Sequence, residues 1–220
     1  MRYKVGKFEI RSENAAKPVG QAAKPLLQWL RKMKPMRAAL DYGCGKLRYS
    51  DAVARKCRNF ALVDSEVQLD RLQKLGRNKT SVRKYARKRW PRCRILTVEQ
   101  FHRDRRKYDF VLCANVLSAI PDETVRSKTL TRLASALRGK GRCLFVAQYQ
   151  NSYFKKVAAS PLAIPHLDGW VLRTKRGSFY YGLLDRQRLT ELVAEHGFRI
   201  QEAWAESQSA YVLAGKDSIE

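Results

Sequence analysis

The stretch Ala38-Ala39-Leu40-Asp41-Tyr42-Gly43-Cys44-Gly45-Lys46-Leu47-Arg48 decides the fold of this 220-residue chain. It begins as an apolar run, reaches an acid at Asp41 and opens into a turn that contains two glycines. Gly43 and Gly45 can adopt positive φ angles and let backbone N–H groups approach a ligand closely. We expect a helix from Arg48 to Cys57 whose N-terminus points at the same place. The stretch therefore predicts a first β-strand that leads into the nucleotide-binding loop of an α/β domain.

A second acid follows at the spacing that such a loop requires. The apolar run from Phe60 to Val63 ends at Asp64, nineteen residues beyond Gly45. Crossover connections bring the ends of adjacent parallel strands to one edge of the sheet, so this acid can accept hydrogen bonds from ribose hydroxyls. The dinucleotide fingerprint would need glycine or alanine where this chain has Arg48, which argues against a dinucleotide cofactor.

The segment Leu40-Asp41-Tyr42-Gly43-Cys44-Gly45 resembles motif I of the class I S-adenosylmethionine (SAM) dependent methyltransferases. That motif has an acid, a glycine two residues later, Cys or Ser, and a second glycine. The family commonly has a further glycine where this chain has Leu47. The resemblance covers residues 38–215 and implies an α/β fold. Its Rossmann-like seven-stranded sheet would be mostly parallel, with an antiparallel last strand and helices on both faces, and SAM would be the cofactor.

The resemblance also indicates where the cofactor would lie along the sheet. Ile95 to Val98 is expected to be the third strand, with the adenine beside its end and Glu99 as the nearest acid. Tyr108 to Leu117 resembles the fourth strand and motif IV, which lines the cleft beyond the strand's carboxyl end. The cofactor-binding residues implied by these matches are Asp41, Gly43, Cys44, Gly45, Asp64, Ser65, Glu99, Asn115 and Val116.

The remaining elements follow from hydrophobic periodicity and helix-end signals. We expect helices over Glu66 to Leu75, Pro121 to Leu137 and Asp185 to His196, the second of which ends at Gly139-Lys140-Gly141. The fifth strand is predicted over Cys143 to Ala147. The last two strands are predicted over Phe198 to Trp204 and Ala210 to Ala214.

Residues 1–37 form an N-terminal extension before the methyltransferase domain. Tyr3, Val5, Phe8 and Ile10 indicate a short extended piece, and a helix is expected to begin near Pro25. In the resembling family such a helix often caps the cofactor cleft, but a helix that only packs on the domain is the favoured interpretation.

The charge of the chain points to a polyanionic partner. Its 45 Lys and Arg against 20 Asp and Glu give a net charge of +25 and a pI near 10.3. Nucleic acid is the first partner to expect, and an anionic membrane surface the second. The five cysteines include no C-x-x-C pair, which favours reduced thiols, no metal site and a cytoplasmic setting. No leader peptide or run of 18 apolar residues is present, so neither secretion nor membrane insertion is expected.

About half of this charge lies in one segment. Residues 71–107 contain 15 Lys and Arg against two acids, a net +13. A basic helical insertion over about residues 77–94 is predicted, with an apolar stripe at helical spacing, namely Val82, Tyr85, Ala86 and Trp90. The residues predicted to project outward and contact nucleic-acid phosphates are Arg83, Lys84, Arg87 and Lys88. The alternative is an ordinary solvated face.

A second insertion covers about residues 149–184. Its aromatic residues are interleaved with lysines and arginines, a composition suited to base stacking and phosphate contact. It could equally be a lid whose aromatics pack onto the domain. We expect this lid-like segment to be mobile and to become ordered when cofactor and substrate bind.

Little catalytic machinery is expected, because the methyl group of a sulfonium is already activated and the protein chiefly positions the reactants. Ala114-Asn115-Val116-Leu117 lacks the Asp/Asn-Pro-Pro-aromatic signature of exocyclic-amine methyltransferases, and no Pro-Cys nucleophile is present there. A ring nitrogen or a hydroxyl remains as the acceptor. His166 and Tyr149 are the candidate catalytic residues.

These observations predict SAM-dependent methyl transfer to nucleic acid, with RNA favoured over DNA. One alternative is a methyltransferase of a small molecule or a protein, because Asn115 to Pro121 resembles the corresponding segment of small-molecule enzymes. The other is a non-catalytic nucleic-acid-binding module on a methyltransferase-like fold.

Overall fold

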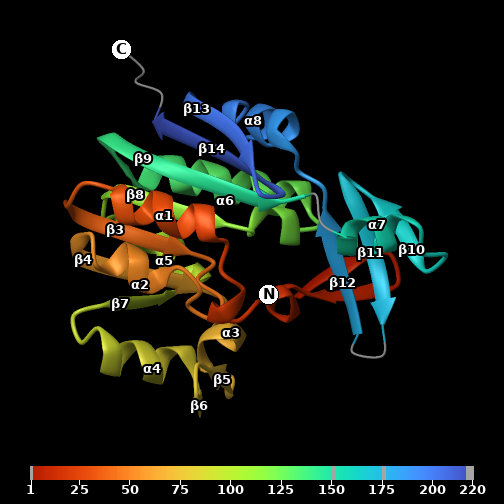
Figure 1. Ribbon diagram of the computed structural model, residues 1–220, viewed down its shortest axis with the longest axis horizontal. Helices are drawn as coiled ribbons and strands as arrows, with labels where there is room; N and C mark the ends of the chain where they lie inside the picture. Colours follow the sequence, from red (N-terminus) through yellow and green to blue (C-terminus); the bar gives the residue numbers. More distant parts are fainter. Residues whose placement is uncertain (1, 150–151, 175–176, 217–220) are drawn as a thin grey trace.

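The computed structural model describes residues 2–149, 152–174 and 177–216, and its centre is a seven-stranded sheet (Figure 1). The strand order is β13-β14-β9-β8-β3-β4-β7, and only β14 runs antiparallel to the other six. The strands are β3 (Met36–Tyr42), β4 (Cys57–Asp64), β7 (Arg94–Thr97), β8 (Tyr108–Ala114), β9 (Leu137–Gln148), β13 (Phe198–Glu206) and β14 (Ser209–Lys216). The predicted fold class is confirmed.

The strand β3 lies in the interior of the sheet, between β8 and β4, because its sequence is apolar on both faces. Its last five residues, from Ala38 to Tyr42, are all buried. Leu40 aligns with Ala61 of β4 on one side and with Val111 of β8 on the other. A parallel strand covered on both faces needs such a continuous apolar run, and a half-exposed strand would alternate instead.

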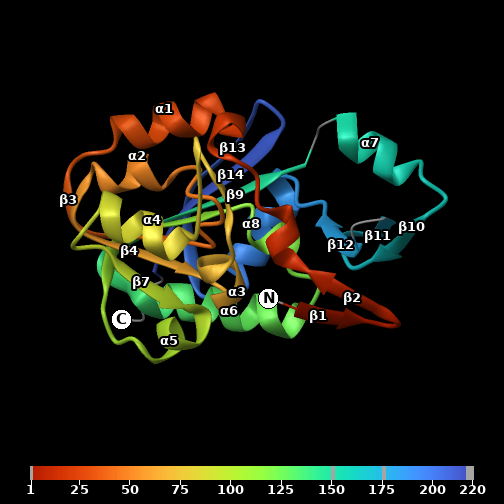
Figure 2. The same cartoon turned by 90° about the horizontal axis from the view of Figure 1, so that it is seen from below.

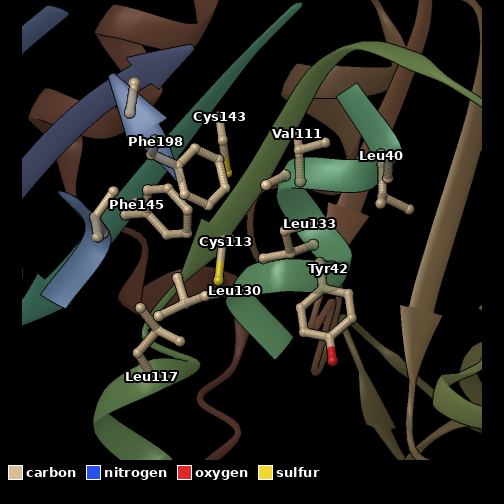
Figure 3. Packing of buried hydrophobic residues seen from close by; sticks show 14 of the residues in the cluster. Leu40, Tyr42, Val111, Cys113, Leu117, Leu130, Leu133, Cys143, Phe145 and Phe198 are labelled. Atoms are coloured by element: carbon tan, nitrogen blue, oxygen red, sulfur yellow. The ribbon is translucent and has the colours of Figure 1, made fainter. Parts of the chain in front are cut away.

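Helices cover both faces of the sheet (Figure 2). On one face lie α1 (Lys24–Lys32), α2 (Ser50–Ala54), α3 (Glu66–Asp70) and α4 (Val82–Arg89). On the other lie α5 (Val98–Arg103), α6 (Glu123–Ala136) and α8 (Arg186–Ala194). The second face is packed with aromatic, aliphatic and cysteine side chains (Figure 3). There Phe145 and Phe198 meet edge to face with ring centroids 5.0 Å apart.

Three predicted boundaries were wrong. The helix expected over Glu66 to Leu75 ends at Asp70, and the chain continues as a hairpin of β5 (Gln73–Leu75) and β6 (Asn78–Thr80). Gly76 has φ +61° in the hairpin turn, a conformation that suits glycine and breaks the helix. The helix expected over Arg48 to Cys57 is only the short α2. Gly139 and Gly141 lie within β9 instead of separating it from α6.

A second sheet has five strands, in the order β1-β2-β12-β11-β10. It joins the N-terminal β1 (Arg2–Val5) and β2 (Phe8–Arg11) to β10 (Ala163–His166), β11 (Gly169–Thr174) and β12 (Gly177–Gly182). Figure 1 shows this sheet beside the carboxyl ends of the central strands, with α7 (Ser152–Ala158) next to it. Three strands of the segment predicted as a lid are therefore built into a sheet with the N-terminal extension.

A buried arginine ties this second sheet to the helical layer. The side chain of Arg126 in α6 is only 2% exposed. Its Nε donates to Ile120 O at 2.8 Å, its Nη2 donates to the Tyr180 hydroxyl at 2.8 Å, and its Nη1 donates to Asp168. Asp168 also accepts from Arg188 Nε of α8 at 2.8 Å.

The N-terminal helix α1 begins near Pro25 as expected and packs on the domain. Leu26 and Leu30 are fully buried against the sheet. The Trp29 ring stacks on Trp204 with centroids 6.3 Å apart. These contacts favour the packing interpretation of α1. Three short 3-10 helices complete the described chain: η1 (Ser12–Ala15), η2 (Val19–Gln21) and η3 (Leu117–Ala119). In the part of the chain that the structure describes, no helix combines the length and apolarity needed to cross a membrane.

Candidate functional site

A pocket of about 110 Å³ lies at the carboxyl ends of β3, β4 and β8. Eight of the nine residues predicted to bind the cofactor line it, namely Asp41, Gly43, Cys44, Gly45, Asp64, Ser65, Asn115 and Val116. The topology explains this convergence, because parallel neighbours end at the same edge of the sheet. Whether these residues bind a cofactor stays a prediction, but the structure brings them together.

The loop after β3 has the backbone conformation that its glycines permit. Gly43 and Gly45 have φ angles of +70° and +55°. A Cβ on Gly43 would overlap Cγ2 of Val116, which lies directly against the loop. The Gly43 N–H donates to Val63 O at 2.8 Å, which holds the loop against β4. Glycine at position 43 is thus required both by its φ angle and by the close approach of Val116.

Leu47 occupies the position where the resembling family commonly has glycine, and it has the conformation of a glycine. Its φ is +61°, in the left-handed region that costs a residue with a Cβ about 1–2 kcal/mol. Its side chain is only 5% exposed and packs in the cluster that includes Leu26 and Val53. Burial of the leucine offsets the strained backbone, so the loop keeps its shape without the third glycine.

Asp64 closes the loop from the end of β4. Its Oδ2 accepts the Gly45 N–H at 2.8 Å, and its Oδ1 accepts the Ser65 N–H at 2.8 Å. Burial raises the pKa of the Asp64 carboxyl, and the two backbone hydrogen bonds oppose that rise. Ser65 caps α3, since its Oγ accepts the Gln68 N–H at 3.3 Å.

Asp41 ends β3 as a buried acid. Its Oδ2 accepts the Ser50 hydroxyl at 2.6 Å, and the residue is only 4% exposed. Burial raises the pKa of Asp41 to about 7, and the hydrogen bond from Ser50 opposes that rise. A nearby cation would stabilise the ionised carboxylate, so this end of the pocket suits a positively charged ligand.

The motif IV residues form the other wall. Asn115 has φ +59°, in the left-handed region that asparagine tolerates better than most residues. Its N–H donates to Val146 O at 2.7 Å, and its Oδ1 accepts the Gln148 N–H at 3.0 Å. These bonds fix the turn that places Val116 over Gly43.

Glu99 is the exception among the predicted cofactor residues. It is exposed in the first turn of α5 and does not line the pocket, which its neighbour Val98 does. Hydrogen bonds from its own backbone and from Thr97 lower the pKa of its carboxyl. β7 ends at Thr97, and the next residue, Val98, takes the position that lines the pocket. Glu99 follows one residue later and is exposed.

Sequence reasoning missed the pocket residues that come from outside the motifs. These include Tyr3, Glu13, Lys17, Gln68 and Ile120. Only Gln68 had a local signal, since it stands three residues after the helix cap Ser65. Its Nε2 donates to Gly45 O at 2.6 Å, and its buried Oε1 has no hydrogen-bond partner among the described residues. That oxygen is available to a ligand donor.

The two candidate catalytic residues lie outside the pocket lining. His166 Nε2 is 2.7 Å from Pro121 O, so in this arrangement that nitrogen is a donor and does not act as a base. Its ring also meets Tyr180 edge to face at 5.8 Å. Tyr149 packs against the core cluster, and its N–H donates to Gln208 O at 3.1 Å. Their positions do not support the proposed catalytic roles.

The basic helix forms as predicted over α4. Val82 and Ala86 are fully buried, and the Trp90 ring meets Phe60 edge to face at 5.4 Å. Lys84, Arg87 and Lys88 are exposed.

The expectation that Arg83 projects outward with its three neighbours was wrong. Its guanidinium donates to both Asp70 oxygens, at 2.7 and 2.9 Å, and its side chain is 21% exposed. The hairpin β5–β6 replaces the end of the predicted helix and leaves Asp70 at the C-terminus of α3, within reach of α4.

A basic groove of about 900 Å³ runs between α1, α2 and α4. Its cations are Arg31, Lys46, Arg48, Arg55, Lys56 and Arg89, and Tyr85 and Trp90 contribute aromatic surface. Asp51 is the acid in this lining and pairs with Arg55 at 2.7 Å and with Arg89 at 2.9 Å. Lys46 and Arg48 line the groove and the pocket at once, so the two adjoin at the glycine loop.

The aromatic residues of residues 149–184 divide between packing and exposure. Tyr180 is buried in the cluster with Ile10 and Val171. Trp170, Phe179 and Tyr181 are partly exposed. The side chains of Tyr153 and Phe154 lie outside the described residues.

Comparisons with known proteins agree with this fold. A model of the methyltransferase domain family matches residues 14–203. The chain is 35% identical to the uncharacterized protein YmfD of Escherichia coli (strain K12) over 215 residues, which are 98% of this chain and 96% of that protein.

Solved structures share the fold at low identity. The PH0226 protein of Pyrococcus horikoshii OT3 is similar with a TM-score of 0.64 and 15% identity, over 88% of this chain and 87% of that one. The 1,6-didemethyltoxoflavin-N1-methyltransferase of Burkholderia thailandensis, solved with S-adenosylhomocysteine, has a TM-score of 0.61 and 14% identity, over 89% and 78% of the chains. Together with the family match, these likenesses identify the chain as a member of the methyltransferase domain family, with the fold of the class I, SAM-dependent enzymes.

Proposed function

We propose that this methyltransferase binds SAM in the glycine-loop pocket and transfers its methyl group to nucleic acid, with RNA favoured over DNA. The observation that carries the choice of substrate is the basic groove that adjoins the pocket at Lys46 and Arg48. A polyanion bound in that groove would pass the mouth of the pocket.

The residues of the pocket fit SAM, which carries a sulfonium, an ammonium and a carboxylate. Asp41, Asp64 and Glu13 supply acids, and Lys17, Lys46 and Arg48 supply cations. Gly43 and Gly45 allow the ligand to approach the backbone closely. The free Oε1 of Gln68 offers an acceptor for a hydroxyl or amino group. In this assignment Asp64 accepts from the ribose hydroxyls.

SAM supplies an activated methyl group, and the protein supplies position and a dry environment. Val116 and Ile120 give the wall of the pocket beyond β8 an apolar surface, and Tyr3 covers it from the N-terminal hairpin. An acceptor that carries its own lone pair, such as a ring nitrogen, needs no base from the protein. This fits a pocket whose lining includes neither His166 nor Tyr149.

The preference for RNA rests on how a base can reach the pocket. The pocket lies among buried residues such as Asp41 and Cys44, so a base must leave its stack to enter. Loops and single strands of RNA present bases in that state. The five free cysteines are consistent with the cytoplasm, where such RNA is found.

A small-molecule substrate is the second candidate, and the second sheet favours it. Tyr3 of β1, residues of η1 and Ile120 also line the pocket and enclose it. Such enclosure suits an acceptor that enters whole. The structurally similar Burkholderia thailandensis enzyme was solved with its small-molecule substrate 1,6-didemethyltoxoflavin.

Incubation with SAM labelled in its methyl group tests these alternatives. RNA, DNA and a small-molecule extract are offered separately, and each fraction is counted. Label in RNA supports the proposal, and label only in the small-molecule fraction overturns it. Asp64→Ala is the negative control. It removes charged hydrogen bonds worth about 1.5–3 kcal/mol each, so SAM affinity by calorimetry should fall at least tenfold. If the parent protein binds no SAM, the result would favour the alternative of a non-catalytic nucleic-acid-binding module.

A further inference from the structure

A second basic hollow, of about 430 Å³, lies at the opposite edge of the central sheet. It is formed where β3, β4, β7, β8 and β9 begin, whereas the glycine-loop pocket lies where the parallel strands end. Its cations are Arg37, Arg92, Arg94, Arg106, Lys107 and Arg138. We refer to it as the amino-end hollow.

Three of these six cations have a partner, which is an acid or a backbone oxygen. Arg94 Nη1 donates to Asp104 Oδ2 at 2.6 Å, and Lys107 donates to the backbone oxygen of Ser135. Arg138 Nε lies 2.9 Å from Asp109 Oδ1. That Nε is buried, yet it lacks the alignment of a hydrogen bond with any described acceptor. Arg138 is nonetheless paired with Asp109 and is not counted among the free cations.

The other three charges are Arg37, Arg92 and Arg106. All are exposed, and within the described ranges none of their side chains has an acidic or hydrogen-bonding partner. They come from three separate parts of the chain, and the fold brings them around one hollow. Uncompensated cations gathered around a concave surface concentrate the field and attract a polyanion.

The walls of the hollow are rigid. Its lining includes the buried Phe60 of β4 and Tyr108 at the start of β8. The Ala38 N–H donates to Asp109 Oδ2 at 2.8 Å, which ties the start of β3 to β8. Arg37 lies in β3 on this frame, whereas Arg92 lies in the turn after α4 and Arg106 in the loop before β8.

The hollow continues the basic surface of α4 around the edge strand β7. Arg92 follows α4 after a short turn, in which Cys93 N–H donates to Trp90 O at 2.8 Å. The first half of the basic segment 71–107 thus supplies α4, and the second half supplies Arg92, Arg94, Arg106 and Lys107 of the hollow. The charge of that segment is therefore divided between α4 and the amino-end hollow.

We propose that the amino-end hollow binds backbone phosphates of the nucleic-acid substrate, at a distance from the reacting base. This inference rests on the proposed function for the identity of the polyanion. The seven residues of β3 span about 23 Å at the usual rise of a strand. That length corresponds to about seven steps of a nucleic-acid helix, so only a substrate longer than this reaches both sites.

The test compares two variants that lose the same charge. Arg37→Gln, Arg92→Gln and Arg106→Gln together remove the free cations of the hollow. Lys128→Gln, Arg186→Gln and Arg199→Gln together remove three exposed cations of α6, α8 and β13, none of which lines the hollow. Binding is measured by fluorescence anisotropy for a long RNA hairpin of about twenty base pairs and for a short RNA of about five nucleotides, over a salt series.

We expect the hollow variant to bind the long RNA at least about tenfold more weakly, with a salt slope lower by about one per lost contact. It should bind the short RNA and SAM as the parent does, and the control variant should behave as the parent throughout. An equal loss of RNA affinity in both variants, or for both RNAs, would overturn the assignment of the hollow as a phosphate site. The proposed methylation of RNA would be unaffected by that result. A parent that binds neither RNA overturns both proposals, whereas RNA that is bound but not methylated overturns only the proposed function.

Discussion

The hydroxyl of Ser50 donates a 2.6 Å hydrogen bond to Oδ2 of Asp41, and this bond does not compensate the carboxylate for its burial. The native pKa of Asp41 is about 7, against 3.8 for the free side chain. The folded state therefore binds a proton more tightly than the unfolded state between these values.

Stability contributed by this group should fall as the pH rises from about 4 to 7, by as much as about 4 kcal/mol. Urea denaturation of the parent and of Asp41→Asn across that range measures the effect. The difference between the two should grow with pH and level off above the native pKa. Ser50→Ala removes the hydrogen bond that opposes the rise in the pKa of Asp41, so the stability of this variant should continue to decline to a higher pH. Parallel curves for parent and Asp41→Asn would show that Asp41 titrates normally.

At Leu47, substitution by glycine should destabilise the protein less than substitution by alanine, which is the reverse of the usual order. Both substitutions lose the buried leucine side chain and cost stability, on the order of 2–5 kcal/mol for Leu47→Ala. Glycine alone also relieves the strain of the left-handed backbone, worth about 1–2 kcal/mol, at an entropic cost of about 0.5–1 kcal/mol. We expect Leu47→Gly to be the more stable of the pair by about 0.5–1 kcal/mol in urea denaturation.

The matched control is the buried Leu69, which lies in α3 and has no positive φ. There Leu69→Ala should be more stable than Leu69→Gly by about 1 kcal/mol, the normal order in a helix. The same order at both positions would mean that the backbone at Leu47 is not strained.

Gly43→Ala should weaken SAM binding at least tenfold, because the new methyl group would overlap Val116 and the φ of +70° disfavours a side chain. Adding Val116→Ala should restore part of the affinity, since it removes the overlapping atoms. Gly139→Ala is the control, because nothing lies within 4 Å of its Cβ position. Calorimetric titration of the variants with SAM checks all three. No recovery in the double variant would mean that the backbone angle, and not Val116, sets the requirement for glycine.

Arg126→Gln should destabilise the protein by about 3 kcal/mol or more, because the buried partners Asp168 and Tyr180 lose their donor. Amide exchange should speed up in β11 and β12, which Arg126 anchors through those partners. Arg188→Gln removes the more exposed partner of Asp168, 40% exposed, and should cost about 1 kcal/mol or less. If both variants exchange like the parent, the second sheet is held by its own strands and not by Arg126.

Those exchange data also bear on the mobile lid predicted from the sequence. Slow exchange of β11 and β12 in the free parent would remove the basis for a lid. Faster exchange that slows when cofactor and substrate bind would support it.

The central sheet and one wall of the pocket were predictable because their signals are local. Asp41 and Asp64 each end an apolar run, and a parallel topology brings such ends together whatever the packing. The buried stripe of α4 was equally readable from its helical spacing. Gln73 and Leu75 were misassigned to a helix because the apolar spacing of α3 continued past Asp70. The hairpin depends on a turn at Gly76, and helical spacing carries no information about that turn.

The second wall was not predictable for a different reason. Tyr3, Glu13 and Lys17 reach the pocket only because β2 lies beside β12, and no feature of either segment specifies that pairing in advance. Arg83 shows the same limitation for charge. Arg83 was correctly predicted to lie on the helix. Its partner Asp70 lies within reach only because the β5–β6 hairpin follows α3, and that hairpin was not predicted.

The pairing of Ile10 with Ser178 joins strands that lie far apart in the sequence, so they are synthesised at well-separated times. The N-terminal hairpin must therefore wait, without its neighbour, until most of the chain has left the ribosome. Contacts between residues so distant in sequence form late and slowly, because a long loop must close first. The wall that carries Tyr3 is then completed only after the strand ends at Asp41 and Asp64 are in place. A chain that stops short of β12 could bring the strand ends at Asp41 and Asp64 together but would leave the pocket open on the side of Tyr3, so we expect methyl transfer only once β12 is in place.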